Sequence, residues 1–409
     1  MTGPARTQGV RRHNLSLVLR HLDAHGPCSR TELARGTGLV PASVTALVAD
    51  LIARGLVAES PFPTLGAPGG GRGRPRRPVR LASGRVTIVA VRVSLERLDV
   101  LAADLAGGTL HQTSVPHRAS FGDAGALATA IAAAVDAERV PGRTVRVAIA
   151  MAGPITGDTV AAAIDFGWPS TDLRALVAAR LDDPPPIDVV NDANVAALAE
   201  YRALAARGVR HPGTVAYIKA DTGVGGGLLV DGRVHAGSHG TAGEIGHMPL
   251  ALDGPPCACG ARGCLAVYAG PEPLTRAAGI PSPGSGEALA ELDRRLHAGD
   301  ERAVAAVREA GRAVGAAILG VSALADAGEV ILGGYLATWE PWLAPGIAEQ
   351  TAGRRALVPG LQPAVTRGVL GPEAALHGAL QTGRDAVLSD PSAVPVPGTD
   401  RARTTTARK

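Results

Sequence analysis

The first sixty residues carry apolar side chains at the spacing of short amphipathic helices. The earliest run predicts a helix that stops near Gly26-Pro27, and its apolar positions are Leu15, Val18, Leu19 and Leu22. Ser29-Arg30-Thr31-Glu32 has the form of a capping box, which starts a second helix. Gly38 suits the left-handed turn after this helix, because glycine adopts a positive φ without steric cost.

A third helix is predicted from Pro41, since proline is favoured at the first helical position, and it ends at Gly55. Its apolar stripe comprises Val44, Leu47, Val48, Leu51 and Ile52. Two short strand candidates follow at residues 56–59 and 79–81. Three helices and two strands in this order indicate a winged helix-turn-helix head over residues 10–80.

From about residue 86 the pattern changes to apolar strands that alternate with alanine-rich helices. Strands are expected at 86–93, 98–105, 145–150, 187–190, 215–219 and 228–230, with helices at 124–135 and 195–207. Residues 221–227 read as a glycine-rich loop, and Asp231-Gly232 as a hairpin turn. The pattern predicts an α/β body of two lobes over residues 81–388. Residues 389–409, rich in Pro, Thr and Arg, are predicted to be a disordered tail.

Composition narrows the class of protein. The chain has 409 residues, 46% of them hydrophobic, which is enough for two or three domains. It contains neither a signal-peptide pattern nor an apolar run near the roughly 20 residues that span a bilayer, so we expect no membrane contact. Cys28 is the one cysteine outside a local cluster, which fits a reducing compartment. We therefore expect a cytoplasmic protein.

Positive charge is concentrated in the head. Residues 1–80 hold twelve arginines, no lysine and four acidic residues, whereas the whole chain has a net charge of only +4. A basic head on a mildly acidic body indicates a polyanion partner for the head. Aromatic residues make up 2% of the chain, which disfavours stacking on single-stranded bases. Double-stranded DNA is the expected partner.

The third helix would read the major groove. Ser43, Thr45 and Ala46 face away from its apolar stripe, and Arg54 would meet phosphate. The arginine-rich segment between the two strands is either a wing in the minor groove or an unstructured linker, and the ordered helices before it favour the wing. The candidate DNA-contacting residues are Ser29, Arg30, Pro41, Ala42, Ser43, Thr45, Ala46, Arg54, Arg72, Arg74 and Arg76.

Three cysteines lie within eight residues. Cys257, Cys259 and Cys264 form a Cys-x-Cys-x4-Cys run, and His247 precedes them. Three thiolates and one imidazole are the ligands of a closed structural zinc site. The alternative is that the cysteines are small buried residues and His247 a loop histidine. The spacing and the glycine-rich loop favour zinc.

Taken in order, these motifs resemble the ROK family of repressors, open reading frames and sugar kinases. They are the winged head, Asn191-Asp-Ala-Asn194, Thr222-Gly-Val-Gly-Gly-Gly227, Gly243-Glu-Ile-Gly-His247 and Cys257-Ala-Cys-Gly-Ala-Arg-Gly-Cys-Leu265. The resemblance implies an actin-like or hexokinase-like body whose two lobes close on a sugar. It implies zinc on His247, Cys257, Cys259 and Cys264. It also implies sugar contacts from Asn191, Asp192, Glu244 and His247, although Ala266 stands where the family usually has a second glutamate.

The kinase function of that family needs a phosphate loop resembling Asp-x-Gly-Gly-Thr-Lys. The corresponding segment here is Arg92-Val-Ser-Leu-Glu-Arg97, in which bulk and negative charge replace the glycines. We therefore expect no ATP binding and no enzyme activity. The sequence predicts a homodimeric or homotetrameric repressor that binds operator DNA, with a sugar or sugar phosphate as the candidate effector. The alternatives are an ATP-dependent sugar kinase with a DNA-binding head and a regulator that senses no small molecule.

Overall fold

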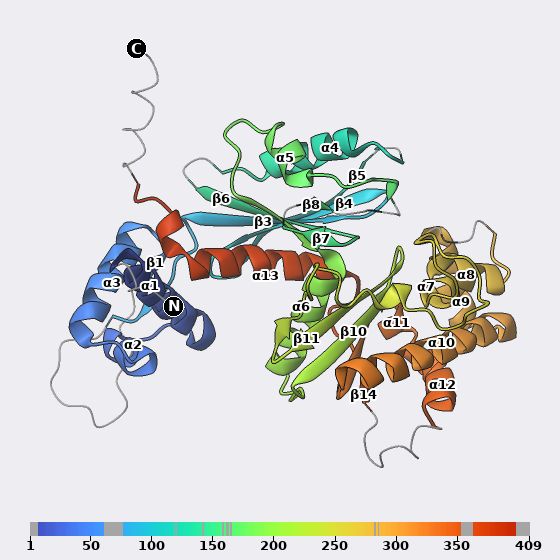
Figure 1. Cartoon of the computed structure of the whole chain (residues 1–409). Helices are drawn as coiled ribbons and strands as arrows, with labels where there is room; N and C mark the ends of the chain where they lie inside the picture. Colours follow the sequence, from blue (N-terminus) through green and yellow to red (C-terminus); the bar gives the residue numbers. More distant parts are fainter. Residues whose placement is uncertain are drawn as a thin grey trace.

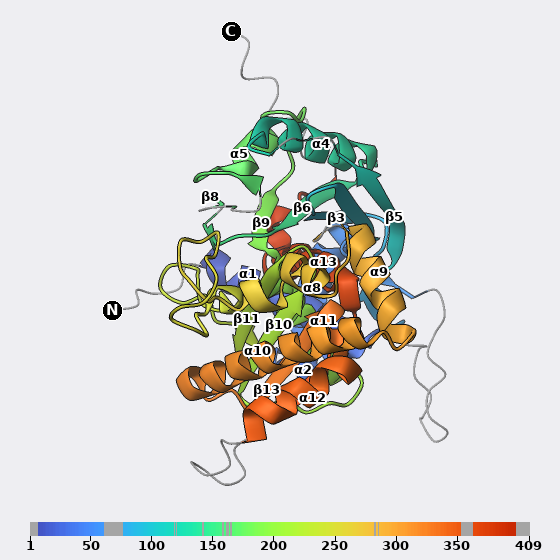
Figure 2. The same cartoon turned by 90° about the vertical axis from the view of Figure 1, so that its right-hand side faces the viewer.

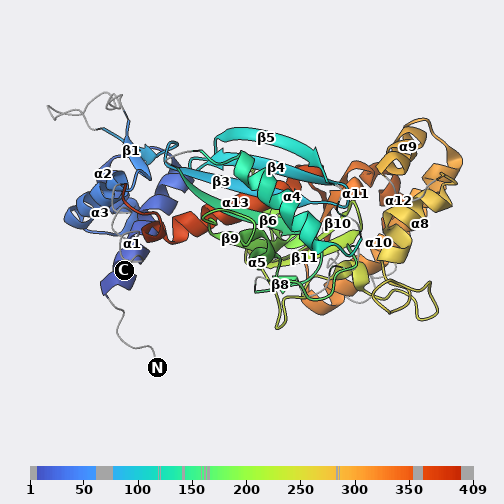
Figure 3. The ribbon, with the colours of Figure 1, turned by 90° about the horizontal axis from the view of Figure 1, so that it is seen from above.

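The computed structural model describes residues 7–60, 77–117, 119, 121–140, 143–157, 159–160, 163, 166–281, 284, 286–352 and 363–397. The chain forms a helical head and a body of two lobes, each lobe built on a five-stranded sheet (Figure 1). The head lies at one end of the molecule, and α8 (Pro271–Ala277) and α9 (Gly286–His297) lie at the other (Figures 1 and 3). Within these residues, no single helix is both long and apolar enough to cross a membrane, although the bent pair Arg30–Thr37 and Pro41–Ala53 passes that test jointly.

The head has the three helices and two strands that the sequence predicts. They are α1 (Thr7–His25), α2 (Arg30–Thr37), α3 (Pro41–Ala53), β1 (Val57–Glu59) and β2 (Val79–Leu81), and the two strands pair antiparallel. Both hydrogen bonds of the capping box form between Ser29 and Glu32, and Gly38 has φ 72°. The predicted apolar positions are buried except Ile52, which is 38% exposed, so the buried stripe of α3 ends at Leu51. Most of the predicted wing lies in residues 61–76, outside the described residues.

The first lobe has a sheet covered on both faces. Its strands are β3 (Val86–Val93), β4 (Arg97–Asp104), β5 (Thr109–Pro116), β6 (Thr144–Met151) and β9 (Ile187–Asn191), in the order β5-β4-β3-β6-β9. In β3, Val89 and Val91 pack toward α4 (Ala124–Ala137) and α5 (Leu173–Ala178), whereas Ile88 and Ala90 face α13 (Ala374–Ser389). Two covered faces explain why β3 is apolar at nearly every position. The short strands β7 (Ile155–Thr156) and β8 (Thr159–Val160) form a separate hairpin.

The second lobe repeats this layering. Its strands are β10 (Thr214–Ala220), β11 (Val224–Val230), β12 (Arg233–Val234), β13 (Glu329–Gly334) and β14 (Ala364–Arg367), in the order β12-β11-β10-β13-β14. The helix α6 (Asp192–Ala206) packs on one face, and α10 (Glu301–Ala325) and α12 (Glu340–Thr351) lie under the other (Figure 2). The shorter elements are α7 (Ala266–Ala269), α11 (Tyr335–Thr338), η2 (Ile245–His247) and η4 (Gly371–Glu373).

The glycine-rich stretch corrects one prediction, because residues 224–227 belong to β11 rather than to a loop. A Cβ on Gly226 would lie 2.6 Å from the carbonyl oxygen of Gly243, and one on Gly227 would lie 2.9 Å from the Cβ of Ala197. The glycines therefore let a strand pack directly against α6 and the loop before η2. The predicted turn at Asp231-Gly232 is confirmed, since both residues have positive φ between β11 and β12.

The segment after α13 corrects another prediction. Residues 391–393 form the 3-10 helix η5, and Val394 is buried against the head. The Arg54 guanidinium donates to the carbonyl oxygens of Val394 at 2.7 Å and Ser392 at 3.2 Å. The predicted disordered tail is therefore wrong for residues 389–397, because packing and hydrogen bonds to the head hold this segment. Residues 398–409 lie outside the described residues.

We expect Arg54→Met to weaken the attachment of residues 391–394 to the head without removing a contact to DNA phosphate. The amides of Ala393 and Val394 should exchange with solvent about tenfold faster, because a charged hydrogen-bond donor to the segment is lost. Hydrogen exchange with mass spectrometry measures this, and Arg35→Met, at an exposed position of α2, is the matched control. The account is contradicted if exchange is unchanged, or if the salt slope of DNA binding falls by about 0.9, the value for one lost phosphate contact.

Candidate functional site

A cavity of about 820 Å³ lies between the two lobes. The first lobe contributes residues 152–154 after β6, and the second contributes the end of β10 and the start of β11. The start of α6, the η2 loop and the cysteine loop complete its wall. A concave site at a lobe boundary with several converging polar groups is the usual place for a small ligand.

The four predicted sugar-contacting residues all line this cavity: Asn191, Asp192, Glu244 and His247. Asn191 caps α6, because its side-chain oxygen accepts the amide of Asn194 at 2.8 Å while its side-chain nitrogen donates to the carbonyl of Gly153 at 2.9 Å. Asp192 is the first residue of α6. Ala266 also lines the cavity, so the position of the absent glutamate faces the same space.

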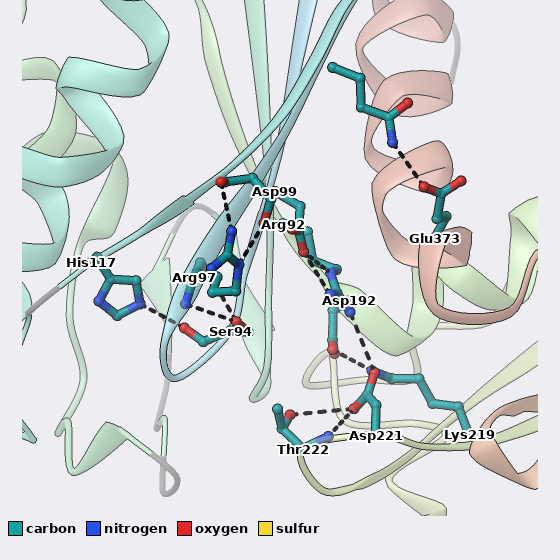
Figure 4. A network of polar contacts seen from close by, with 12 residues as sticks. Arg92, Ser94, Arg97, Asp99, His117, Asp192, Lys219, Asp221, Thr222 and Glu373 are labelled. Atoms are coloured by element: carbon teal, nitrogen blue, oxygen red, sulfur yellow. Dashed lines mark hydrogen bonds and ion pairs between the residues drawn. The ribbon is translucent and has the colours of Figure 1, made fainter. Parts of the chain in front are cut away.

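Asp192 does not stand free in the cavity. The Lys219 ammonium donates to Asp192 Oδ2 at 2.6 Å and to Asp221 Oδ2 at 2.8 Å. From the other lobe, Arg92 pairs with Asp99 Oδ2 at 2.6 and 2.9 Å and reaches within 3.9 Å of Asp221 (Figure 4). Five side chains thus alternate in charge across the cleft. We call this set the charge chain: Asp99, Arg92, Asp221, Lys219 and Asp192.

The charge chain keeps Lys219 and Asp221 ionised. Burial disfavours the charge on Lys219, but the carboxylates of Asp192 and Asp221 outweigh this and raise the lysine pKa above its usual value. Burial likewise opposes ionisation of Asp221, yet Lys219 and then Arg92 hold its pKa below the usual range. Glu244 behaves in the opposite way, because burial and the nearby Asp192 charge raise its pKa. At neutral pH, Lys219 and Asp221 therefore form an ion pair.

Sequence reasoning missed Lys219, Asp221 and the pairing role of Arg92. The available signal was a lysine within the apolar strand Val215-Ala-Tyr-Ile-Lys-Ala220, followed by an acid two residues later on the same face. A buried lysine requires a partner, but the sequence does not say which carboxylate provides it. Glu272 of α8 also lines the cavity and pairs with Arg276.

The cysteine loop brings the predicted metal ligands together. His247 Nδ1 lies 3.6 Å from the sulfur of Cys257, and the sulfurs of Cys259 and Cys264 are 3.7 Å apart. The four ligand atoms all lie within 4.8 Å of one another. Tetrahedral coordination with bonds of 2.0–2.3 Å separates ligand atoms by roughly 3.3–3.8 Å, so the donor set fits a four-coordinate ion. His247 faces the cluster through Nδ1, and the same residue lines the cavity.

The structure also sorts the predicted DNA-contacting residues. Four of them form an exposed face on the first half of α3: Pro41, Ala42, Thr45 and Ala46, with Ser43 half-buried. Arg30 is half-buried and pairs with Glu59 at 2.8 Å. The predicted DNA contacts of Ser29 and Arg54 must be corrected. Ser29 is buried in the capping box, and Arg54 binds Asp50 and the C-terminal segment. Arg72, Arg74 and Arg76 lie outside the described residues.

Comparison with known proteins shows which family the chain belongs to. A family model described as ROK family matches residues 88–384, and one described as MarR family matches residues 16–64. The chain belongs to the ROK family. These matches confirm a winged helix-turn-helix head of MarR type followed by an actin-like or hexokinase-like body. This is the predicted fold class.

Individual ROK relatives include both kinases and repressors. The chain is 39% identical to N-acetylmannosamine kinase of Citrobacter koseri over 39% of its own length and 53% of the kinase, so it spans about half of that relative. It is 26% identical to the xylose repressor of Bacillus subtilis over 65% of this chain and 68% of the repressor.

Solved structures of a regulator and of a kinase share the fold. One is a ROK family transcriptional regulator, described as a homologue of the E. coli MLC protein, with TM-score 0.71, 24% identity and coverage of 93% and 98% of the two chains. The other is a ROK family glucokinase from Streptomyces griseus in complex with glucose and AMPPNP, with TM-score 0.61, 29% identity and coverage of 73% and 99%. The regulator therefore matches head and body together, whereas the glucokinase match covers about three quarters of this chain.

We expect Lys219→Met to destabilise the protein by about 3 kcal/mol at pH 7, because it leaves Asp192 and Asp221 buried without their shared cation. The loss should persist down to about pH 4 and shrink only at lower pH. The Asp221 pKa is depressed in the folded wild type, so its stabilisation is present above the unfolded pKa and is lost as pH falls through the folded pKa. Urea unfolding at pH 7 and at about pH 2 to 3 measures this. Arg312→Met, which removes an exposed pair, is the control, and an equal loss in both variants contradicts the account.

Proposed function

We propose that this ROK protein is a DNA-binding transcriptional repressor whose body binds a sugar effector. The observation that carries the proposal is the fusion of a MarR-type head, with an exposed face on α3, to a sugar-kinase-like body whose cleft is spanned by the charge chain. A homodimer or homotetramer would place two α3 helices in successive major grooves of operator DNA in the cytoplasm.

The effector would act by changing the relation between body and head. The helix α13 provides the connection, because its Asp385 pairs with Arg202 of α6 at 2.9 Å and with Arg20 of α1 at 3.7 Å. The helix α6 begins at Asp192 in the cavity, so movement of the lobes would reach α1 through packed helices. A sugar changes operator affinity only if it binds the two arrangements with different affinity.

The alternative is an ATP-dependent sugar kinase with a DNA-binding head. The identity with kinases and the cavity position of Asp192 favour it, since an aspartate there would remove a hydroxyl proton as general base. Against it, Asp192 Oδ2 is held by Lys219, and Arg92 to Arg97 lack the glycines that a phosphate loop needs. An assay of ADP release on a panel of sugars separates the two functions. Turnover that Asp192→Asn abolishes would establish the kinase.

The metal site is proposed to hold zinc on His247, Cys257, Cys259 and Cys264. The four ligand atoms suit a borderline-soft ion in tetrahedral coordination. When bound, zinc would supply a structural crosslink. The chain itself ties this loop to the cavity, because Glu244, three residues before His247, lines the same space.

Zinc binding predicts about one equivalent of metal per chain in protein purified without chelators. Cys259→Ser should lose most of this zinc and lower the melting temperature, because metal binding contributes folding free energy. Mass spectrometric metal analysis measures the first effect and calorimetry the second. Cys28→Ser, which changes the cysteine outside the cluster, is the matched control. The zinc site is refuted if the wild type is purified without metal and its melting temperature equals that of Cys259→Ser.

DNA binding predicts that a negative charge on the exposed face of α3 weakens operator affinity. Ala46→Glu should raise the operator Kd at least about thirtyfold, since it replaces a group near base edges with a carboxylate beside phosphates. Fluorescence anisotropy on DNA from upstream of the protein's own gene measures this. Ala305→Glu makes the same change on an exposed position of α10 and should leave the affinity unchanged. Equal affinities of the two variants would argue against α3 as the reading helix.

A further inference from the structure

Asp221 lies in the turn between β10 and β11, and its carboxylate accepts hydrogen bonds from the residues around it. Asp221 Oδ1 accepts the backbone amide of Thr222 at 2.6 Å and its hydroxyl at 3.3 Å. Asp221 Oδ2 accepts Lys219 at 2.8 Å. Turns followed by glycines present backbone amides that bind phosphates and other anions. In this chain, the amide of Thr222 in such a turn and the buried ammonium of Lys219 in β10 already hold an anion that is covalently part of the protein.

Arg92 approaches the same carboxylate from the other lobe. It lies near the end of β3, and two of its nitrogens hold Asp99 Oδ2 at 2.6 and 2.9 Å. Its remaining terminal nitrogen is 3.9 Å from Asp221 Oδ2, which is an ion-pair distance but too long for a hydrogen bond (Figure 4). An approach of the lobes by roughly 1 Å would convert this contact into a direct hydrogen bond.

We propose that Asp221 is an internal anion standing where a phosphate group would bind, and that Arg92 closes onto it when the lobes shut around a ligand. This inference rests on the proposed function and concerns the regulation of the same cavity. The lobes can then close on a sugar without a nucleotide, because a carboxylate supplies the negative charge between them. The charge chain has three carboxylates against two cations, so it repels a further phosphate. The effector is therefore a sugar without a phosphate group.

Removing the internal anion should create a phosphate site. Asp221→Ala leaves Arg92 and Lys219 facing the emptied turn, while Lys219 keeps Asp192 as counter-ion and the fold is retained. The probe is inorganic phosphate, titrated into full-length protein against chloride of equal ionic strength, with the melting temperature as readout. We expect Asp221→Ala to gain a saturable rise of about 3 °C or more, and the wild type to gain none beyond the chloride control. Adding Arg92→Ala to Asp221→Ala should remove most of that rise.

The controls separate a built site from general anion binding. Glu309→Ala unpairs the exposed Arg312 far from the cavity and should show no saturable response. If Asp221→Ala does not fold, as judged by circular dichroism, Asp221→Ser takes its place. The proposal is overturned if phosphate stabilises the wild type as much as the variant, if the variant does not respond, or if the response survives Arg92→Ala.

These outcomes are independent of the proposed function. If phosphate does not stabilise Asp221→Ala, the internal-anion proposal is wrong, but the proposed operator binding and sugar response are unaffected. If the wild-type protein does not bind the operator, the proposed repressor function is wrong, but the comparison of phosphate binding can still be interpreted.

Discussion

The buried ammonium of Lys219 allows two carboxylates to lie together in the cleft. Without it, the carboxylates of Asp192 and Asp221 would repel each other, and burial would favour the neutral form of Asp221. With it, Asp192 accepts a hydrogen bond from Lys219 at the start of α6, and the Asp221 carboxylate lies in the turn before β11. Arg92 extends this pairing to the first lobe. On our proposal, the same contacts would favour an uncharged sugar over a nucleotide in this cleft.

The ends of α6 and α13 connect this cleft to the head. Asp385 is shared between Arg202 on α6 and Arg20 on α1, and Arg384 of α13 pairs with Asp23 of α1. Arg54 of the head also holds the segment after α13. The head is therefore anchored to the helix that packs against both lobes, and a change in lobe arrangement would displace its DNA-reading face.

Local features of the chain were predictable because they depend on neighbouring residues. Helical spacing located α1 to α3, and the capping box at Ser29 and the turn at Asp231-Gly232 formed as expected. The clustering of His247 with the cysteines also followed from spacing. The alternation of strands and helices predicted an α/β body of two lobes. Its actin-like or hexokinase-like arrangement came from the order of the motifs, since short apolar runs do not specify how strands pair.

Features that depend on distant parts of the chain were not predictable. Lys219 meets Asp192 because β10 and the start of α6 converge, and Arg92 joins them because the lobes face each other. Arg54 looked like a phosphate contact, but two carbonyl oxygens that accept from its guanidinium lie about 340 residues away. The glycine run looked like a loop, because nothing local shows that α6 presses against it. In each case an unseen long-range partner decided the role of the residue.

The central claim is that a sugar bound in the body changes how the head holds DNA. The most direct measurement is fluorescence anisotropy of the wild-type protein on DNA from upstream of its own gene, at fixed salt, with glucose, xylose, N-acetylmannosamine, sucrose and their phosphates added in turn. The account predicts tight, sequence-selective binding that at least one unphosphorylated sugar weakens and that sugar phosphates leave unchanged. Binding equal to that on random DNA, or selective binding that no sugar alters, would contradict it.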